Sequence, residues 1–226
     1  MGKALFVTGT GTDVGKTFVT GLIVKKLTEA GLAAGYYKAA MSGNVKDDNG
    51  QLIPGDAVWV KEAAGLAQPT EAMCPYVYEM AVSPHLAARL EHKPISPEVI
   101  ADAYQKVLDR YDYVTVEGIG GILCPIAFDE HKLWLEDVVK MLGLSSVIVA
   151  DAGLGTINSV GLTCAYMKMK HLPVKGIIFN NWTGGAMQED NLKMCEALTG
   201  VKVIARVAPG DDTLAIDTET LLKLYE

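Results

Sequence analysis

The chain has 226 residues, about half of them hydrophobic, and a formal net charge of −7. This length suits one α/β domain over residues 1–226. The acidic balance, without a run of lysines and arginines, argues against a nucleic-acid partner. Since no apolar stretch is long enough to cross a bilayer, we expect a cytoplasmic protein with no membrane partner. The four cysteines form no Cys-x-x-Cys pair, which predicts buried reduced thiols.

Apolar β-like runs alternate with helical patterns along the chain, which is typical of an α/β fold with a mostly parallel central sheet flanked by helices. The expected strands are Ala4–Thr8, Ala34–Lys38, Tyr113–Glu117, Ser146–Asp151, Gly176–Asn180 and Lys202–Ala205. The expected helices are Lys16–Ala30, Asp56–Ala64, His85–Glu91, Pro97–Leu108, Ile157–Met169, Met187–Thr199 and Thr213–Tyr225. The polar segment Met41–Gly55 predicts a loop, and the proline-rich segment Glu71–Pro84 predicts irregular chain or a short edge strand.

The first strand runs into a glycine-rich turn that ends in Gly15-Lys16-Thr17. In such a turn backbone N–H groups surround phosphate oxygens, the lysine adds positive charge, and the threonine hydroxyl can bind Mg²⁺. The helix that follows directs its positive end at the same anion. Compared with the usual spacing there is one extra residue, because Gly9 stands one place too early. The pattern predicts a P-loop NTPase-like fold.

A dinucleotide-binding turn is the alternative interpretation, since Gly9-x-Gly11 begins that motif. Its third glycine would fall at Val14, and Lys38 stands where an acidic residue for the ribose is expected. The nucleoside-triphosphate interpretation is therefore favoured.

Ligands bind beyond the carboxyl ends of the strands in open α/β sheets. Glu117 ends one apolar strand before a glycine-rich turn, and Asp56 opens a helix after a loop. With Thr17 they would make an oxygen-rich site for Mg²⁺. The ordinary alternatives are a turn-capping acid for Glu117 and a helix cap for Asp56.

A lysine also ends the second strand, at position 38. A second ammonium group beside a phosphate loop favours phosphoryl transfer or a second anionic reactant. The alternative is a surface lysine whose head group reaches solvent. Ser42, four residues further on, would hold the acceptor or serve as an ordinary turn residue.

Together these segments resemble the dethiobiotin synthetase family, enzymes of biotin synthesis. Gly9–Thr17 fits the family loop, extra residue included, and Gly35-Tyr36-x-Lys38 with Ser42-Gly43 fits its second-strand pattern. Further similar segments are Ser83–His85, Val116–Gly121, Leu154–Asn158 and Asn180, so that the resemblance runs from about Leu5 to Gly210.

The resemblance implies an ATP- and Mg²⁺-dependent ligase. A diamine, 7,8-diaminononanoate, would react with CO₂ to give a carbamate, which attacks the γ-phosphate of ATP. The second amine would then close the cyclic urea, dethiobiotin, with release of phosphate.

The same resemblance implies the residue roles. The catalytic residues would be Thr12, Lys16, Lys38 and Ser42. The residues that bind Mg²⁺ would be Thr17, Asp56 and Glu117. Nucleotide binding falls to Gly11, Thr12, Asp13, Val14, Gly15, Lys16, Thr17, Phe18, Glu117, Gly118, Gly120, Asn180, Ala208, Pro209 and Gly210. A homodimer is implied, in which Gly153, Leu154, Gly155 and Asn158 receive the substrate carboxylate from the partner subunit, while Ser42 also binds substrate.

The chain departs from the family pattern at a few positions. Gly11 and Asp13 stand where some members have Asp and Glu, and the segment after Lys38 has no proline. The family tyrosine that grips the substrate carboxylate has no clear counterpart, and Asn191 or Leu192 falls near its place.

Three other functions compete with this one. A partitioning-type regulatory P-loop ATPase would need a signature lysine where Gly11 stands. An amide-forming synthetase of the cobalamin pathway would need a glutaminase domain, for which the chain has no room. A nucleotide-binding module without turnover would not require Lys38.

Overall fold

Six strands form the central sheet of the computed structural model, which describes residues 2–225. The strand order is β10-β9-β8-β1-β5-β2. The strands are β1 Lys3–Gly9, β2 Ala34–Lys38, β5 Tyr113–Glu117, β8 Ser146–Asp151, β9 Val174–Asn180 and β10 Val203–Arg206. The neighbouring pairs are all parallel, so the carboxyl ends lie along one edge of the sheet.

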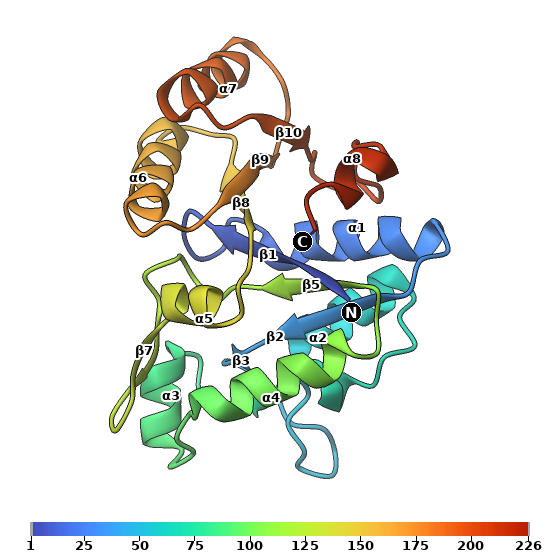
Figure 1. Ribbon diagram of the computed structural model, residues 1–226, viewed down its shortest axis with the longest axis vertical. Helices are drawn as coiled ribbons and strands as arrows, with labels where there is room; N and C mark the ends of the chain where they lie inside the picture. Colours follow the sequence, from blue (N-terminus) through green and yellow to red (C-terminus); the bar gives the residue numbers. More distant parts are fainter. Residues whose placement is uncertain (1, 226) are drawn as a thin grey trace.

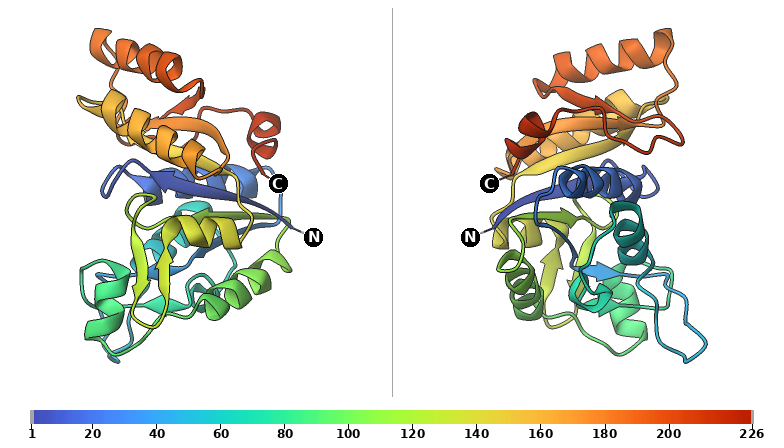
Figure 2. Two further views of the ribbon diagram at one scale, coloured as in Figure 1. Left: turned by 60° about the vertical axis from the view of Figure 1, so that its left-hand side comes forward. Right: turned by 90° about the vertical axis from the view of Figure 1, so that its right-hand side faces the viewer.

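Helices cover both faces of this sheet (Figures 1 and 2). They are α1 Lys16–Glu29, α2 Gly55–Ala64, α3 Pro84–Leu90, α4 Pro97–Leu108, α5 Leu135–Met141, α6 Thr156–Met169, α7 Ala186–Thr199 and α8 Thr218–Leu222. Because successive strand residues point to opposite faces, Phe6 enters one core with helices α3–α7, and Val7 enters the other with α1, α2 and α8. Within residues 2–225 no helix is both long and apolar enough to cross a membrane.

The predicted α/β fold with a parallel central sheet is confirmed. Three strands, Ala34–Lys38, Tyr113–Glu117 and Ser146–Asp151, and the helix Pro97–Leu108 begin and end at the predicted residues. The segment predicted as irregular or a short edge strand contains the end of a 3₁₀ turn, η1 Thr70–Ala72, and the strand β4 Tyr76–Val77. This strand pairs with β3 Ala40–Met41 in a separate small sheet.

The predicted final helix Thr213–Tyr225 is wrong in extent. The helix begins only after Asp217, whose carboxylate accepts the Thr220 N–H at 2.8 Å and so fixes the N-terminus. Sequence reasoning also missed α5 and an antiparallel hairpin, β6 Pro125–Phe128 with β7 Lys132–Trp134. These elements have seven residues or fewer, which is too short for a clear hydrophobic period.

A side chain completes the outer edge of the sheet at β2. The carboxamide of Gln68 accepts the Tyr36 N–H at 2.8 Å and donates to the Tyr36 carbonyl at 2.9 Å. Gln68 is only 1% exposed, so these bonds replace the neighbouring strand in a place that water does not reach.

We expect Gln68→Leu to destabilise the protein by about 2–4 kcal/mol, because two buried backbone groups lose their partners. Urea unfolding would measure this change. The control is Gln105→Leu, which removes an exposed bond from α4 to Asp109 just after the helix and should change stability by less than about 0.5 kcal/mol. Equal stabilities of the two variants would contradict the role of Gln68.

Candidate active site

The glycine-rich turn between β1 and α1 forms a closed loop. Asp13 and Gly15 have φ values of 60° and 87°, so the backbone takes the left-handed conformation that arranges successive N–H groups around an anion. The ammonium group of Lys16 donates to the Gly11 carbonyl at 2.7 Å and spans the loop. These N–H groups and the first turn of α1 form a phosphate site.

The second lysine lies between two carboxylates. The Lys38 ammonium group contacts Asp56 Oδ2 and Glu117 Oε1, each at 2.5 Å. The latter oxygen also accepts from Thr17 Oγ1 at 2.7 Å, and Tyr36 donates its hydroxyl to Glu117 Oε2 at 2.9 Å. Parallel pairing sets this network up, because Lys38 and Glu117 lie opposite each other at the carboxyl ends of β2 and β5.

Burial and charge act differently on the two lysines. Burial, followed by the nearby charge of Lys38, lowers the pKa of Lys16 below its usual value. Burial alone would also lower the pKa of Lys38, but the charges of Glu117 and Asp56 outweigh it and raise this pKa. Burial and the Glu117 charge raise the pKa of Tyr36, so its hydroxyl remains a donor. Lys38 is therefore a fixed positive charge.

One cavity, of about 430 Å³, brings the two lysines together. Residues from the phosphate loop and from the ends of β2 and β5 line it together with Asp56. Ten of the predicted site residues are among them: Thr12, Asp13, Gly15, Lys16, Thr17, Lys38, Ser42, Asp56, Glu117 and Gly120. A group between the lysines would meet two ammonium groups and the loop N–H groups, and also the carboxylates of Asp56 and Glu117, which balance the charge of the two lysines.

The geometry excludes the ordinary alternatives for three of these residues. Lys38 is 5% exposed and hence not a surface lysine. Asp56, in the first turn of α2, bonds to Lys38, and the carboxylate of Glu117 is occupied by side chains of other elements. Among residues 2–225 no cluster of three His, Cys, Asp or Glu residues could hold a metal. The hydroxyl of Thr17 and the carboxylates of Asp56 and Glu117 are nevertheless hard oxygen donors of the type that Mg²⁺ takes with water.

Asn180 lies behind the phosphate loop at the end of β9. Its amide nitrogen donates to the Val14 carbonyl at 3.0 Å, and a Cβ atom on Gly15 would lie 2.0 Å from this nitrogen. The segment Ala208–Gly210 follows β10 directly beside β9, since Val207 donates to the Phe179 carbonyl at 2.8 Å. The residues predicted to surround the base are thus close in space.

Two further predicted nucleotide residues, Gly118 and Phe18, lie outside the cavity lining. Gly118 donates to the Val7 carbonyl at 2.8 Å, and a Cβ atom there would lie 2.8 Å from the Phe6 ring. The Phe18 ring packs against Trp59, with ring centroids 5.6 Å apart, and Phe18 does not line the cavity.

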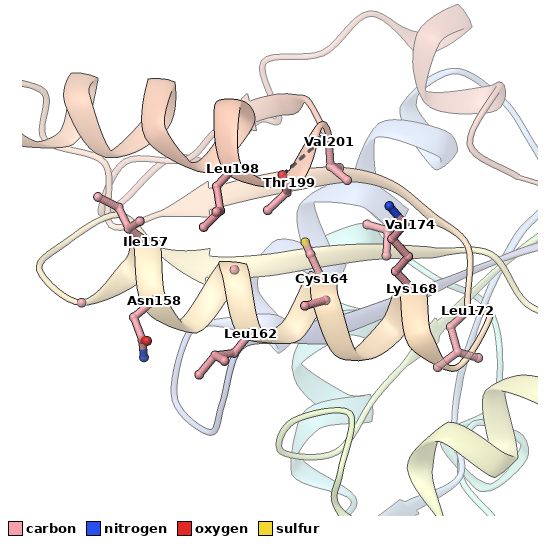
Figure 3. A pocket seen from close by; sticks show the side chains of 13 residues that line it. Ile157, Asn158, Leu162, Cys164, Lys168, Leu172, Val174, Leu198, Thr199 and Val201 are labelled. Atoms are coloured by element: carbon pink, nitrogen blue, oxygen red, sulfur yellow. Dashed lines mark hydrogen bonds between the residues drawn. The ribbon is translucent and has the colours of Figure 1, made fainter.

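The predicted carboxylate segment Gly153–Asn158 lies outside this cavity, at the start of α6. Gly155 and Asn158 line a different hollow, of about 1020 Å³, beside α6 and α7. In Figure 3, Ile157, Cys164 and Leu198 lie between the two helices, while Asn158 and Leu162 point away from α7. Leu154, Leu162 and Leu198 are 88%, 64% and 61% exposed.

Sequence reasoning gave no structural role to two residues that organise these regions, Tyr36 and Asn191. Tyr36 holds Glu117, and its signal was the two-residue spacing from Lys38, which places both side chains on one face of β2. Asn191, on helix α7, contacts Gly153 in the segment after β8. These residues are 38 positions apart, so no local sequence pattern predicts their contact.

Solved structures share this fold. The ParA family ATPase from Chlorobium tepidum TLS superposes with a TM-score of 0.54 at 15% identity, over 98% of this chain and 88% of that chain. The cell division protein FtsY from Thermotoga maritima gives 0.56 at 16% identity, over 99% and 68%. Such low identities show the fold alone. The fold and the phosphate loop define a nucleotide-binding protein of the P-loop class.

Closer relatives identify the family. Residues 3–215 match the family model described as an AAA domain. The ATP-dependent dethiobiotin synthetase BioD of Brachyspira hyodysenteriae is 46% identical over 228 residues, covering 100% of both chains. The protein of that name from Clostridium perfringens is 46% identical over 98% of this chain and 97% of its own. The chain belongs to the dethiobiotin synthetase family.

Replacing Lys38 tests whether its charge stabilises the buried carboxylate of Glu117. We expect Lys38→Met to cost about 3 kcal/mol of stability, because Glu117 stays buried without its main counter-charge. Adding Glu117→Gln removes that charge and should restore most of the loss, as urea unfolding at neutral pH would show. A double variant less stable than Lys38→Met would contradict this account.

Proposed function

We propose that this protein is an ATP-dependent ring-closing ligase that converts diaminononanoate and CO₂ to dethiobiotin. The main support is the cavity lined by Lys16 and Lys38, two cations from separate β–α junctions, with the phosphate loop as its wall. Membership of the dethiobiotin synthetase family supports the substrate class.

The reaction needs two anions to approach each other. One amine of the substrate adds to CO₂ and loses a proton, which gives a carbamate. A carbamate oxygen attacks the γ-phosphorus of ATP, and ADP leaves. The second amine then attacks the carbamate carbon of the mixed anhydride, so that phosphate leaves and the nitrogen loses a proton.

The residues of the cavity suit these steps. Lys16 would neutralise the γ-phosphoryl oxygens and Lys38 the carbamate, which lowers the repulsion between them in a site of low dielectric constant. Thr12 and Ser42 would orient the carbamate through their hydroxyl groups. When bound by Thr17, Asp56 and Glu117, Mg²⁺ supplies further positive charge to the phosphate oxygens.

Asn180 suits adenine as the base. Its nitrogen is engaged by the Val14 carbonyl, which leaves the carboxamide oxygen as an acceptor on the other side. An acceptor matches the exocyclic amino group of adenine and repels the O6 carbonyl of guanine. Ala208, Pro209 and Gly210 would form the neighbouring wall.

A homodimer would complete the substrate site. Leu162 and Met169 lie on the outer face of α6 and are both 64% exposed, in the helix that follows the predicted carboxylate segment. An apolar surface of this kind is suited to a partner subunit. In the dimer Gly153, Leu154, Gly155 and Asn158 of one subunit would receive the carboxylate of a substrate bound beside Ser42 of the other.

The regulatory ATPase is the second candidate, and its support is the fold shared with the ParA family ATPase. Gly11 stands where that class would need its signature lysine. Incubation with ATP, Mg²⁺, bicarbonate and diaminononanoate separates the two functions. The ligase gives a cyclic urea detectable by mass, whereas a folded protein that hydrolyses ATP without forming it would be the regulatory ATPase.

Lys38→Met should reduce turnover by about a hundredfold or more, since its charge stabilises the transition state. The Kd of ATP should change much less, because Lys16 and the loop remain. Lys16→Ala should weaken both. Steady-state kinetics and calorimetric ATP binding provide the measurements, and a Lys38→Met enzyme with nearly full turnover would disprove the role of Lys38.

Leu162→Glu should dissociate the dimer, because two copies would bury like charges at the interface. Light scattering should give the monomer mass, and turnover should fall together with dimer content. Val99→Glu is the control, since Val99 is an exposed apolar residue on α4, away from α6. A Leu162→Glu protein that remains dimeric and active would place the interface elsewhere.

A further inference from the structure

The loop between β8 and α6 is held by hydrogen bonds to residues at and just after the end of β9. The N–H of Ala152 donates to the Asn180 carbonyl at 2.9 Å, and the N–H of Gly153 donates to Asp151 Oδ1 at 2.7 Å. The other oxygen of Asp151 accepts from Asn181 Nδ2 at 2.6 Å. The end of β9 therefore fixes one side of this loop.

Helix α7 fixes the other side through Asn191. Its amide nitrogen donates to the carbonyl of Ala152 at 3.0 Å and to that of Gly153 at 3.1 Å. Asn191 is 6% exposed, so these bonds are shielded from water and strongly constrain the loop. The side chain is too deeply buried to grip a ligand itself, although the family tyrosine falls near this position.

The orientation of the two carbonyl groups decides what the loop offers to a ligand. Because Asn191 draws both oxygens inward, the loop does not present them to an anion. At the start of α6 the N–H of Thr156 donates to the Gly153 carbonyl at 3.4 Å, and the N–H groups of Ile157 and Asn158 follow in the first turn, at the positive end of the helix dipole. A carboxylate would meet these donors, whereas a freed Ala152 carbonyl oxygen would repel it.

We propose that Asn191 is a positioning residue for the substrate carboxylate, acting through Ala152 and Gly153. This inference rests on the proposed function, since the loop Gly153–Asn158 receives the carboxylate only if the substrate is diaminononanoate. In this chain a buried amide shapes the carboxylate loop from inside, where the family pattern expects a side chain that contacts the carboxylate directly.

Asn191→Leu tests the proposal, with Asn191→Asp as a second variant of the same size. Both should raise the KM for diaminononanoate about tenfold to a hundredfold, because a displaced loop misorients its donors. The KM for ATP and the thermal midpoint serve as companion readouts, and the KM for ATP should change less than about twofold.

The matched control is Gln188→Leu. Gln188 lies one turn earlier on α7 and is also 6% exposed. It accepts from the N–H groups of Thr183 and Gly184 and donates to the backbone carbonyl of Asn181 at 3.2 Å, but it contacts neither Ala152 nor Gly153. It should leave the KM for diaminononanoate unchanged.

A vicinal diaminooctane, which lacks the carboxylate, distinguishes positioning from general damage. Wild type and Asn191→Leu should turn it over equally well. An unchanged KM for diaminononanoate, equal losses with both diamines, or the same effect in Gln188→Leu would each overturn the proposal. Failure of the wild-type protein to form the cyclic urea would instead reject the proposed function.

Discussion

A buried charge pair at the carboxyl edge of the sheet is the constraint on which the site depends. Lys38 and Glu117 are 5% and 1% exposed, and their contact at 2.5 Å offsets the cost of burying the two charges. Thr17 and Tyr36 donate further hydrogen bonds to the carboxylate. The pair and its hydrogen bonds therefore link the phosphate loop, β2 and β5, and the charges of Lys16 and Lys38 are balanced by those of Asp56 and Glu117.

Around β8 and β9, on the other side of the phosphate loop from β2, buried side-chain amides rather than charged groups hold the segments together. Asn180 ties β9 to the phosphate loop, and Asn191 ties α7 to the start of α6. Amides can donate and accept without the desolvation cost of an ion, so they suit places where backbone carbonyls must be turned away from an anion.

Charged and neutral polar side chains are therefore found in different parts of the proposed site. Charges lie where the phosphates and the carbamate would meet, and neutral polar groups lie where the base and the substrate carboxylate would be recognised. Gln68 extends the same principle to structure alone, because its carboxamide substitutes for a missing strand at the edge of β2. Each of these side chains satisfies the backbone of a segment distant in sequence.

The sequence by itself determined the class of fold, the central strands and the phosphate loop, because periodicity and a continuous motif are local properties. It also predicted Lys16, Lys38, Thr17, Asp56 and Glu117, since strand ends are recognisable and carboxyl ends of parallel strands share one edge. Only the tertiary structure decided the rest. Lys38 between Asp56 and Glu117, Tyr36 on Glu117 and Asn191 on Ala152 join segments 18 to 81 residues apart. Such contacts depend on how strands pair and helices pack, and no pattern within one segment contains that information.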